Sequence, residues 1–496
     1  MSKRSSHNST SGRPVLMIAC AFPPTGGSGV QRTAKFVKYL PGCGWDPIVW
    51  ARDSVPGMPR DERLAAETPA GIEVFRTGGN FWDGLWERSR RICERGGVLA
   101  PLARRINVRL SRSLPRGRLP DDQIAWARRS VQPLGGLIRL RQVRAIYSTF
   151  SPASDHWLAL ELKRRTGVPW VADFRDLWTD DYRYREPTQH CWAAHRELEQ
   201  AVLETADAVI GVSRRQTEIL ASHVPSRCDR FVTITNGYDP SDFKGVAKAI
   251  AHERESPARA KVFVLAHVGR LDRWRSCEPL FDALADFVRS LGEQRKSFRV
   301  HLVGHSDVAA RERFLMDGVP YRNVGIVDHA DAIRAMASAD ALLLASPDGP
   351  NADSVIPAKT FEYLTSGRPI LSVGPDDGEA ERIVMSCQAG VTAGFARSEI
   401  LAGLCALYDE WRDGSPPFPI HKQALVPFQR QVQASRLARV LDAISEGDLD
   451  LLGELAVDPG YETTGRSTPT LRRPRQPKMA TAGRAGLHDE LVEVGV

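Results

Sequence analysis

The stretch "SVIPAKTFEYLTSGRPILSV", residues 354–373, predicts a short helix, a helix stop and a buried strand. Pro357 suits the first position of a helix, where its missing N–H costs nothing. Gly367 is typical of a helix end, and the apolar segment after it is typical of a strand that is covered on both faces. A helix that leads directly into such a strand indicates a parallel sheet with helices on its faces, so the stretch predicts the α/β class.

The first turn of this helix presents two charged side chains on one face. Lys359 and Glu362 are three residues apart and are therefore neighbours on a helix surface. Free N–H groups at residues 355–358, together with the lysine, would favour a phosphate, while a carboxylate accepts hydrogen bonds from sugar hydroxyls. The alternative is a plain surface ion pair worth about 0.3 kcal/mol, and this helix alone does not decide between the two.

The alternation of strand and helix occurs twice along the chain. A first series of short apolar segments begins with "PVLMIACAF" (14–22), and a second begins with "KVFVLAHVG" (261–269). Such segments, separated by helical stretches, predict doubly wound parallel sheets, so we expect two Rossmann-like domains that face a central crevice. The predicted order is a flexible tail (1–12), a first domain (13–243), a linker (244–260), a second domain (261–415), a closing crossover helix (416–446) and a disordered tail (447–496).

Composition narrows the class of protein. With 496 residues, 42% hydrophobic and 26% charged, the chain is expected to form two or three globular domains. No apolar run approaches the roughly 18 residues of a membrane span, and we interpret residues 14–22 as a strand rather than a signal-peptide core. The eight cysteines are scattered without a C-x-x-C pair, which argues against a structural zinc and fits a cytoplasmic enzyme with reduced thiols.

The positive charge is concentrated in one segment. Residues 88–118 contain ten arginines and one glutamate, a net charge of +9, whereas the whole chain carries +7. Leucine and isoleucine at helical spacing, from Leu99 to Leu110, make this segment better suited to an anionic membrane surface than to nucleic acid. A solvated basic helix face is the alternative.

Two further loops follow the first strand of each predicted domain, where parallel sheets bind ligands. "FPPTGGSGVQR" (22–32) contains Gly27 and Ser28 in a turn that lets the backbone approach a ligand, but it breaks the dinucleotide pattern G-x-G-x-x-G at Arg32. "HVGRLDRWRS" (267–276) supplies Arg270 and Arg275, which suit a diphosphate. A structural turn and solvated arginines are the alternatives for these two loops.

A series of motifs keeps a fixed order along the chain: "FPPTGGSGVQRTAKFVKYLPGCGWDPIVW" (22–50), "GVPWVADFRDLWTDD" (167–181), "ADAVIGVS" (206–213), "ITNGYDPSDF" (234–243), "HVGRLDRWRS" (267–276) and "IPAKTFEYLTSGRPILSVG" (356–374). Together they resemble glycosyltransferase family 4, the retaining, nucleotide-sugar-dependent group with the GT-B fold. The resemblance spans residues 13–446. It implies that the second domain mainly holds the donor and the first domain mainly holds the acceptor.

The resemblance assigns roles on the donor side residue by residue. Glu362 matches the glutamate expected on the donor ribose, with Lys359 beside it. The first glutamate of that paired motif is replaced by Ser354, which puts the contact to the transferred sugar in question. Arg270 matches the diphosphate arginine, and we take Arg275 in place of the lysine partner that has no match.

On the first domain, Gly27 and Ser28 match the glycine loop that approaches the diphosphate. The family's usual histidine is replaced by Arg175, which is flanked by Asp173 and Asp176. Carboxylates beside an arginine can position an acceptor hydroxyl or take its proton, so these three residues are the predicted catalytic group; a structural ion-pair turn is the alternative.

The resemblance implies a hexosyltransferase-like, metal-independent enzyme without a cofactor, in which the leaving diphosphate assists deprotonation of the acceptor. Its partners would be a nucleotide-sugar donor, a sugar or lipid-linked acceptor and an anionic membrane surface, but no nucleic acid. We expect a cytoplasmic location, peripheral on the inner face of the plasma membrane, and a role in cell-envelope polysaccharide or glycolipid synthesis. The alternatives are a noncatalytic nucleotide-sugar-binding or membrane-surface protein, and a dinucleotide-dependent oxidoreductase or epimerase, which the interrupted glycine pattern disfavours.

Overall fold

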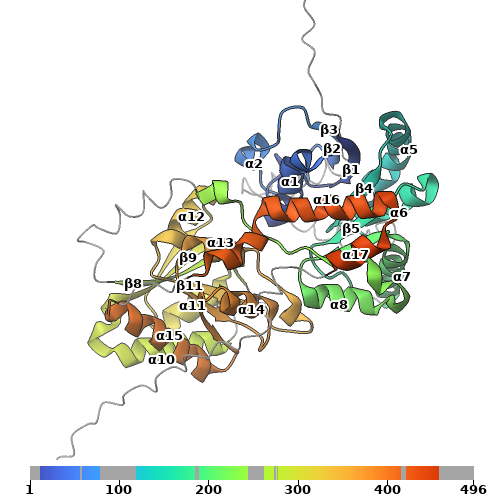
Figure 1. Cartoon of the computed structure of the whole chain (residues 1–496). Coiled ribbons are helices and arrows are strands. Elements are labelled where there is room, and N and C mark those ends of the chain that lie inside the picture. Colours follow the sequence, from blue (N-terminus) through green and yellow to red (C-terminus); the bar gives the residue numbers. More distant parts are fainter. Residues whose placement is uncertain are drawn as a thin grey trace, which may run out of the picture.

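The computed structural model describes residues 12–55, 58–78, 119–184, 189–243, 262–272, 275, 278–414 and 420–456. The basic segment 88–118, on which the membrane prediction depends, lies outside these residues. Figure 1 shows two α/β domains side by side, each built around one parallel sheet. The predicted fold class is confirmed.

The first domain contains a seven-stranded sheet in the order β3-β2-β1-β4-β5-β6-β7, and every pair of neighbouring strands is parallel. Its strands are β1 (Arg13–Ile18), β2 (Trp45–Arg52), β3 (Glu73–Thr77), β4 (Ala145–Phe150), β5 (Trp170–Phe174), β6 (Ala208–Gly211) and β7 (Phe231–Thr233). Its helices are α1 (Ser28–Tyr39), α2 (Glu62–Ala66), α5 (Ile124–Arg141), α6 (Ala153–Thr166), α7 (Gln189–Thr205) and α8 (Arg214–Ser222).

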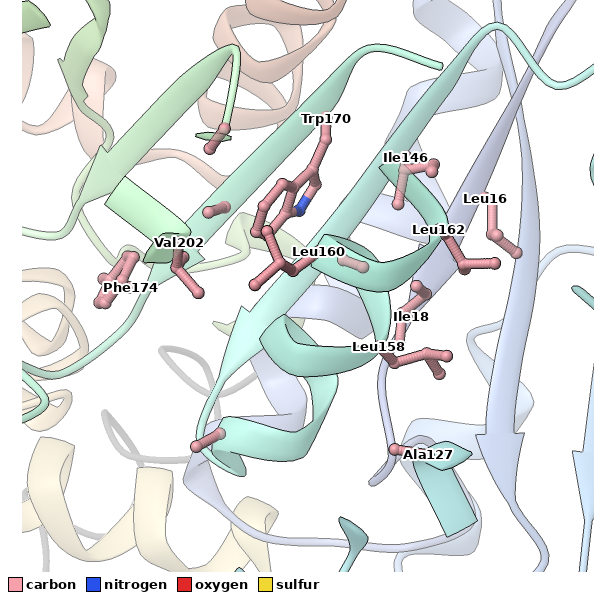
Figure 2. Packing of buried hydrophobic residues seen from close by; sticks show 14 of the residues in the cluster. Leu16, Ile18, Ala127, Ile146, Leu158, Leu160, Leu162, Trp170, Phe174 and Val202 are labelled. Atoms are coloured by element: carbon pink, nitrogen blue, oxygen red, sulfur yellow. The ribbon is translucent and has the colours of Figure 1, made fainter. Parts of the chain in front are cut away.

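The strands are apolar on both faces because helices cover both faces of this sheet. Alternate residues of β1 belong to different cores: Leu16 and Ile18 pack with α5, α6 and α7, whereas Val15 and Met17 pack with α1. Figure 2 shows the first core, in which Leu158, Leu160 and Leu162 of α6 pack in one cluster with Ile18 of β1, Ile146 of β4 and Trp170 of β5.

The second domain contains a six-stranded parallel sheet in the order β10-β9-β8-β11-β12-β13. Its strands are β8 (Phe263–Leu271), β9 (Phe298–Ser306), β10 (Tyr321–Gly325), β11 (Ala341–Ala345), β12 (Ile370–Val373) and β13 (Gly390–Ala393). Its helices are α10 (Glu278–Leu291), α11 (Val308–Met316), α12 (His329–Ser338), α13 (Lys359–Ser366), α14 (Glu379–Ser386) and α15 (Arg397–Arg412). The sequence pattern did not predict β13, whose residues are only partly buried except for Ala393.

The chain then returns to the first domain. After the 3-10 segment η7 (Lys422–Phe428), helix α16 (Arg430–Glu446) packs its apolar side against the first sheet and α1, as Figure 1 shows. A further helix, α17 (Leu449–Leu455), follows within the predicted disordered tail, so that prediction is wrong for these residues. The carboxylate of Asp448 caps α17 by accepting a hydrogen bond from the N–H of Leu451, and Leu452 and Leu455 are buried.

None of the helices in the described part of the chain combines the length and the apolar character that crossing a membrane requires.

Candidate functional site

The strand order of each sheet fixes where a ligand can bind. The order reverses between β1 and β4 in the first sheet and between β8 and β11 in the second. Helices that follow neighbouring strands diverge to opposite faces at such a point, which leaves the carboxyl ends of those strands open to a ligand. We call the loops at these strand ends, together with the start of α13, the interdomain site.

Hydrogen bonds show that the carboxyl ends of the two sheets meet. The Nδ2 group of Asn351, which follows β11, donates to the carbonyl of Asp180 in the loop after β5 (3.0 Å). Arg275, after β8, reaches the hydroxyl of Tyr182 in the same loop at 3.4 Å and pairs with Asp272 at 3.5 Å. The donor-side and acceptor-side loops predicted from the sequence therefore lie in contact.

The glycine loop occupies the open end of β1. Gly27 has φ 119°, a value that side chains rarely adopt, and it directly precedes α1. Gly27 and Ser28 are both exposed. The N–H of Gly26 donates to the carbonyl of Pro59 (2.8 Å), which holds the loop against the following segment. The predicted loop residues thus have accessible backbone at the start of a twelve-residue helix.

Arg175 lies directly against this helix start. A Cβ atom on Gly29 would be 1.9 Å from its Nη1 atom, so a side chain at position 29 would displace the guanidinium from this place. Nε of Arg175 donates to the carbonyl of Phe150 (2.8 Å), and Nη2 donates to the carbonyl of Ser151 (2.5 Å). No carboxylate of the described residues pairs with it, so its charge remains available to an anion beside the glycine loop.

The two predicted aspartates that flank Arg175 are engaged elsewhere. Asp173 is fully buried; it accepts hydrogen bonds from Nε and Nη2 of Arg32 (2.8 Å each) and from the hydroxyl of Tyr147 (2.5 Å). Asp176 is exposed and pairs with Arg183 (3.0 Å). This geometry corrects the prediction for Asp173, because a buried carboxylate with three donors cannot reach an acceptor hydroxyl.

Lys359 and Glu362, the two charged residues in the first turn of α13, form an ion pair. Nζ of Lys359 donates to Oε2 of Glu362 (2.5 Å), and both side chains are partly exposed. The stem of Lys359 lies 3.7 Å from the place where a Cβ on Gly269 would stand, which puts the pair beside the end of β8. Arg270, the next residue, is exposed, and its side chain has no hydrogen-bond or ion-pair partner among the described residues. The Lys359–Glu362 pair therefore lies beside the end of β8, the strand that carries Gly269 and Arg270.

Helix α13 begins at Lys359 rather than at Pro357, and residues 352–354 form a separate 3-10 turn. Within this turn, Ser354 is buried: its hydroxyl donates to the carbonyl of Asn351 (2.6 Å), and its own carbonyl accepts from the hydroxyl of Ser213 (2.6 Å). Ser354 thus joins the two domains through its backbone. Its side chain faces its own turn, which differs from the donor contact expected at this position.

The structure also places a buried arginine that the sequence did not point to. Arg430, the first residue of α16, is buried between the domains, and its Nη1 lies 3.4 Å from Oδ1 of Asn236 and 3.3 Å from Oε1 of Gln433. Burial, and next the charge of Arg32, lower its pKa to about 9. Its position at the start of the predicted closing helix, outside any quoted motif, gave no signal in the sequence.

Among the described residues, one group of carboxylates is close enough to share a metal ion: Glu67, Asp239 and Asp242. However, Nζ of Lys35 lies 2.6, 2.8 and 3.5 Å from their oxygens, and Lys38 pairs with the first two. The hydrogen bonds of the two lysines lower the pKa of Asp239 despite its burial. This group is an ion-pair network and does not fit a metal.

A separate pocket of about 310 Å³ lies between α6 and α7. Trp157, Leu160 and Leu198 form part of its wall, and none of the predicted site residues lines it. The interdomain site therefore remains the candidate functional site.

Comparisons with known proteins agree with this architecture. Residues 29–242 match the model of the family Glycosyltransferase Family 4. HepE from Anabaena, solved with UDP and glucose, is 16% identical over 89% of this chain and 100% of that chain, with a TM-score of 0.52. Sucrose-phosphate synthase from Thermosynechococcus elongatus is 15% identical over 89% of this chain and 99% of its own chain, with a TM-score of 0.53. A glycosyltransferase from Rickettsia africae is 13% identical over 92% of this chain and 100% of its own chain, with a TM-score of 0.52. No curated protein sequence matches the chain significantly.

At these identities the solved structures show a shared fold, and the family match covers most of the first domain. The resemblance inferred from the motifs is confirmed. Residues 29–242 are therefore similar to glycosyltransferase family 4, and the chain shares the two-domain GT-B fold of these solved structures.

Proposed function

We propose that this protein is a glycosyltransferase that moves a sugar from a nucleoside-diphosphate donor to an acceptor hydroxyl. The observation that carries the proposal is the contact between the loops at the carboxyl ends of the two sheets, because residues suited to a nucleotide sugar lie on both sides of that contact. Arg175 and the glycine loop lie at the switch point of the first sheet, and Arg270, Lys359 and Glu362 lie at that of the second. Exposed backbone and cations suit a diphosphate, and a carboxylate suits ribose hydroxyls.

In the proposed reaction, the bond between the anomeric carbon and the diphosphate oxygen breaks, and a bond from the acceptor oxygen to the same carbon forms. The acceptor proton passes to the leaving diphosphate, so no protein base is required. Negative charge grows on the diphosphate as its bond breaks, and Arg270, Lys359 and Arg175 would stabilise that charge. Asp176 remains the one flanking carboxylate that is exposed enough to orient an acceptor.

We further propose that transfer occurs with retention and without a metal, that the sugar is a hexose, and that the acceptor is a sugar or a lipid-linked sugar of a cell-envelope polysaccharide or glycolipid. The reaction would take place at the cytoplasmic face of the plasma membrane. These proposals are supported by the motif resemblance and by the +9 charge of residues 88–118. HepE, which shares the fold, is described in complexes with UDP and UDP-glucose.

A screen of nucleotide sugars tests the function. A ligand present at 100 times its dissociation constant adds about 2.7 kcal/mol to the free energy of unfolding, which a thermal melt detects. We expect one donor to raise the melting temperature and to be hydrolysed slowly without an acceptor. Because Ser354 turns away from the expected donor contact, a noncatalytic binder is the competing function. Stabilisation without hydrolysis or transfer would favour that binder, and no stabilisation by any nucleotide sugar would reject both.

A further inference from the structure

Arg430 lies where the chain returns from the second domain to the first. Its N–H donates to the carbonyl of Tyr238 (2.9 Å), and the N–H of Tyr238 donates to the carbonyl of Phe428 (3.0 Å). The ring of Phe428 packs on that of Phe361, with centroids 5.1 Å apart, and Glu362 is the next residue. The backbone of Arg430 is therefore fixed close to the start of α13, which carries the proposed donor carboxylate.

The charge of Arg430 is poorly compensated by the protein. The residue is 6% exposed, yet no carboxylate lies within ion-pair distance of it in the described part of the chain. Its side-chain hydrogen bonds both come from Nη1 and are long, at 3.3 and 3.4 Å, to the uncharged amides of Gln433 and Asn236. Nε and Nη2 donate to no described residue. A buried guanidinium normally has a bidentate partner, because an uncompensated charge inside a protein is costly.

Arg32 provides the comparison within the same site. It is equally buried, but Asp173 receives two of its N–H groups, and the carbonyls of Ile234 and Thr235 receive two more hydrogen bonds at 2.9 and 2.7 Å. The oxygens of Asp173 are also used by Tyr147 and are not left for Arg430.

The charges that face Arg430 come from four elements: Arg32 from α1, Asp173 from β5, Asp239 from the turn after β7, and Glu362 from α13. Asp173 and Asp239 are already paired, with Arg32 and with two lysines respectively. Glu362 pairs with Lys359. Arg430 therefore has no carboxylate of its own among the described residues, although it lies at the junction of the two domains, next to the site proposed for the donor.

We propose that Arg430 is a further donor-binding residue, and that its guanidinium receives a phosphate oxygen of the nucleoside diphosphate at the base of the interdomain site. A phosphate matches the planar arrangement of the N–H groups and supplies the missing negative charge. The inference rests on the proposed function, since it names one more residue of the same donor site.

The test compares Arg430→Met and Arg430→Lys with the wild type. Binding of ADP, GDP, CDP, UDP and dTDP is measured by calorimetry, and binding of the matching nucleoside is measured by ligand-observed NMR. For the best diphosphate, we expect the methionine variant to lose affinity at least tenfold, the lysine variant to lose less, and the nucleoside to bind as before. The unliganded methionine variant should melt at the wild-type temperature or above, because an unpaired buried charge has been removed.

Arg436→Met is the matched control. Arg436 is a buried arginine on the same helix, and its Nη2 donates to the carbonyls of Thr233 (3.1 Å) and Leu455 (3.0 Å). Its replacement should lower the melting temperature and leave diphosphate affinity unchanged.

Each outcome decides the inference. If the wild type binds a diphosphate and both Arg430 variants bind it equally well, Arg430 is not a donor residue, although the proposed function stands. Equal losses for diphosphate and nucleoside would assign Arg430 a general structural role instead. If the wild type binds none of the five diphosphates, the proposed function fails and the inference fails with it. Should the methionine variant not fold, the lysine variant alone gives the same comparison.

Discussion

Two buried carboxylates next to the interdomain site, those of Asp173 and Glu199, have different hydrogen-bond partners. Asp173 is held by the guanidinium of Arg32, whereas Glu199 of α7 is 1% exposed and accepts a hydrogen bond from the hydroxyl of Thr179. Burial, which the Thr179 hydroxyl only partly offsets, raises the pKa of Glu199 to about 7. Thr179 belongs to the loop after β5, so the protonation state of Glu199 affects a loop that contributes Arg175 and Asp176.

Replacing Glu199 with Gln should therefore stabilise the protein only at higher pH. Between the unfolded pKa of 4.5 and about 7, the native state binds a proton that the unfolded state has lost, so wild-type stability falls as pH rises through this window. The variant does not titrate, and by pH 8 it should be more stable by about 3 kcal/mol. Urea unfolding at pH 4.5 and pH 8 measures the difference. If the variant and the wild type differ in stability by the same amount at both pH values, protonation of Glu199 is not the cause of that difference.

Glu362 should contribute to donor affinity more than to stability. Its side chain is only partly buried, and its ion pair with Lys359 is local. Glu362→Gln keeps the shape but removes the charge, and a hydrogen bond to a charged group is worth about 1.5–3 kcal/mol. We expect roughly 10- to 100-fold weaker donor binding by calorimetry with an unchanged circular-dichroism melt. Unaltered donor affinity would remove this residue from the site.

Substitutions of Arg270 and Arg275 should have different effects, because within the described part of the chain only the side chain of Arg275 has protein partners. Arg270→Ala is expected to lower kcat/KM at least tenfold without changing the melting temperature, since an exposed side chain without contacts contributes little to folding. Arg275→Ala should lower both, because it also removes the contact to Tyr182 between the domains. Full turnover by the Arg270 variant would assign that arginine to the solvated surface.

At the scale of elements, the segment "TNGY" (235–238) packs closely against the start of α16. A Cβ on Gly237 would lie 2.0 Å from the carbonyl oxygen of Phe428 and 2.6 Å from Nε2 of Gln433. Gln433 in turn donates to the carbonyl of Asn236 (2.7 Å). The glycine in this motif is therefore required by the close approach of the crossover segment and not by a ligand.

Gly237→Ala should destabilise the protein by about 1–3 kcal/mol, because backbone atoms must move to admit the new methyl group. Urea unfolding gives the value. Gly42→Ala is the control, because nothing lies within 4 Å of a Cβ at that position. If the two substitutions change the free energy of unfolding equally, the crossover segment can move to admit the methyl group without a loss of stability.

The elements were largely predictable, since each core strand is a short apolar run between helices and each sheet is covered on both faces. The exceptions are β13, whose partly buried residues do not form an apolar run, and α17, whose two buried leucines lie in a polar context. Local sequence does not show when a neighbouring element will cover a weakly apolar segment.

The site was predictable only in part, for a different physical reason. Lys359 and Glu362 could be paired from their helical spacing, and the glycine loop from its strand–turn–helix context. The partners of Asp173 and Ser354 are far away in the sequence, at Arg32 and Ser213. Whether a carboxylate is buried or reaches a ligand depends on such long-range contacts, which one sequence does not display.

At the scale of the whole molecule, the basic segment 88–118 contrasts in charge with the rest of the chain, which is slightly acidic. Residues 88–118 carry +9, and each arginine near an anionic surface contributes about 1 kcal/mol. We expect the protein to co-sediment with anionic vesicles at low salt and to be released at 1 M salt, where the Debye length is about 3 Å. Neutral vesicles are the control. A folded protein that stays in the supernatant with anionic vesicles at low salt would contradict the membrane role.

Helix α16 also has a consequence for the order in which the chain is completed on the ribosome. Its Leu437, Val440 and Leu441 belong to the core of the first domain, although the whole second domain lies before them in the sequence. The second domain ends its own sheet at β13 and can finish folding while the first still lacks part of its core. At roughly 5–20 residues per second, the stretch from Phe243 to Arg430 delays that completion by on the order of ten seconds or more. During this time the apolar side of α1 that α16 will cover is exposed to water in the nascent first domain.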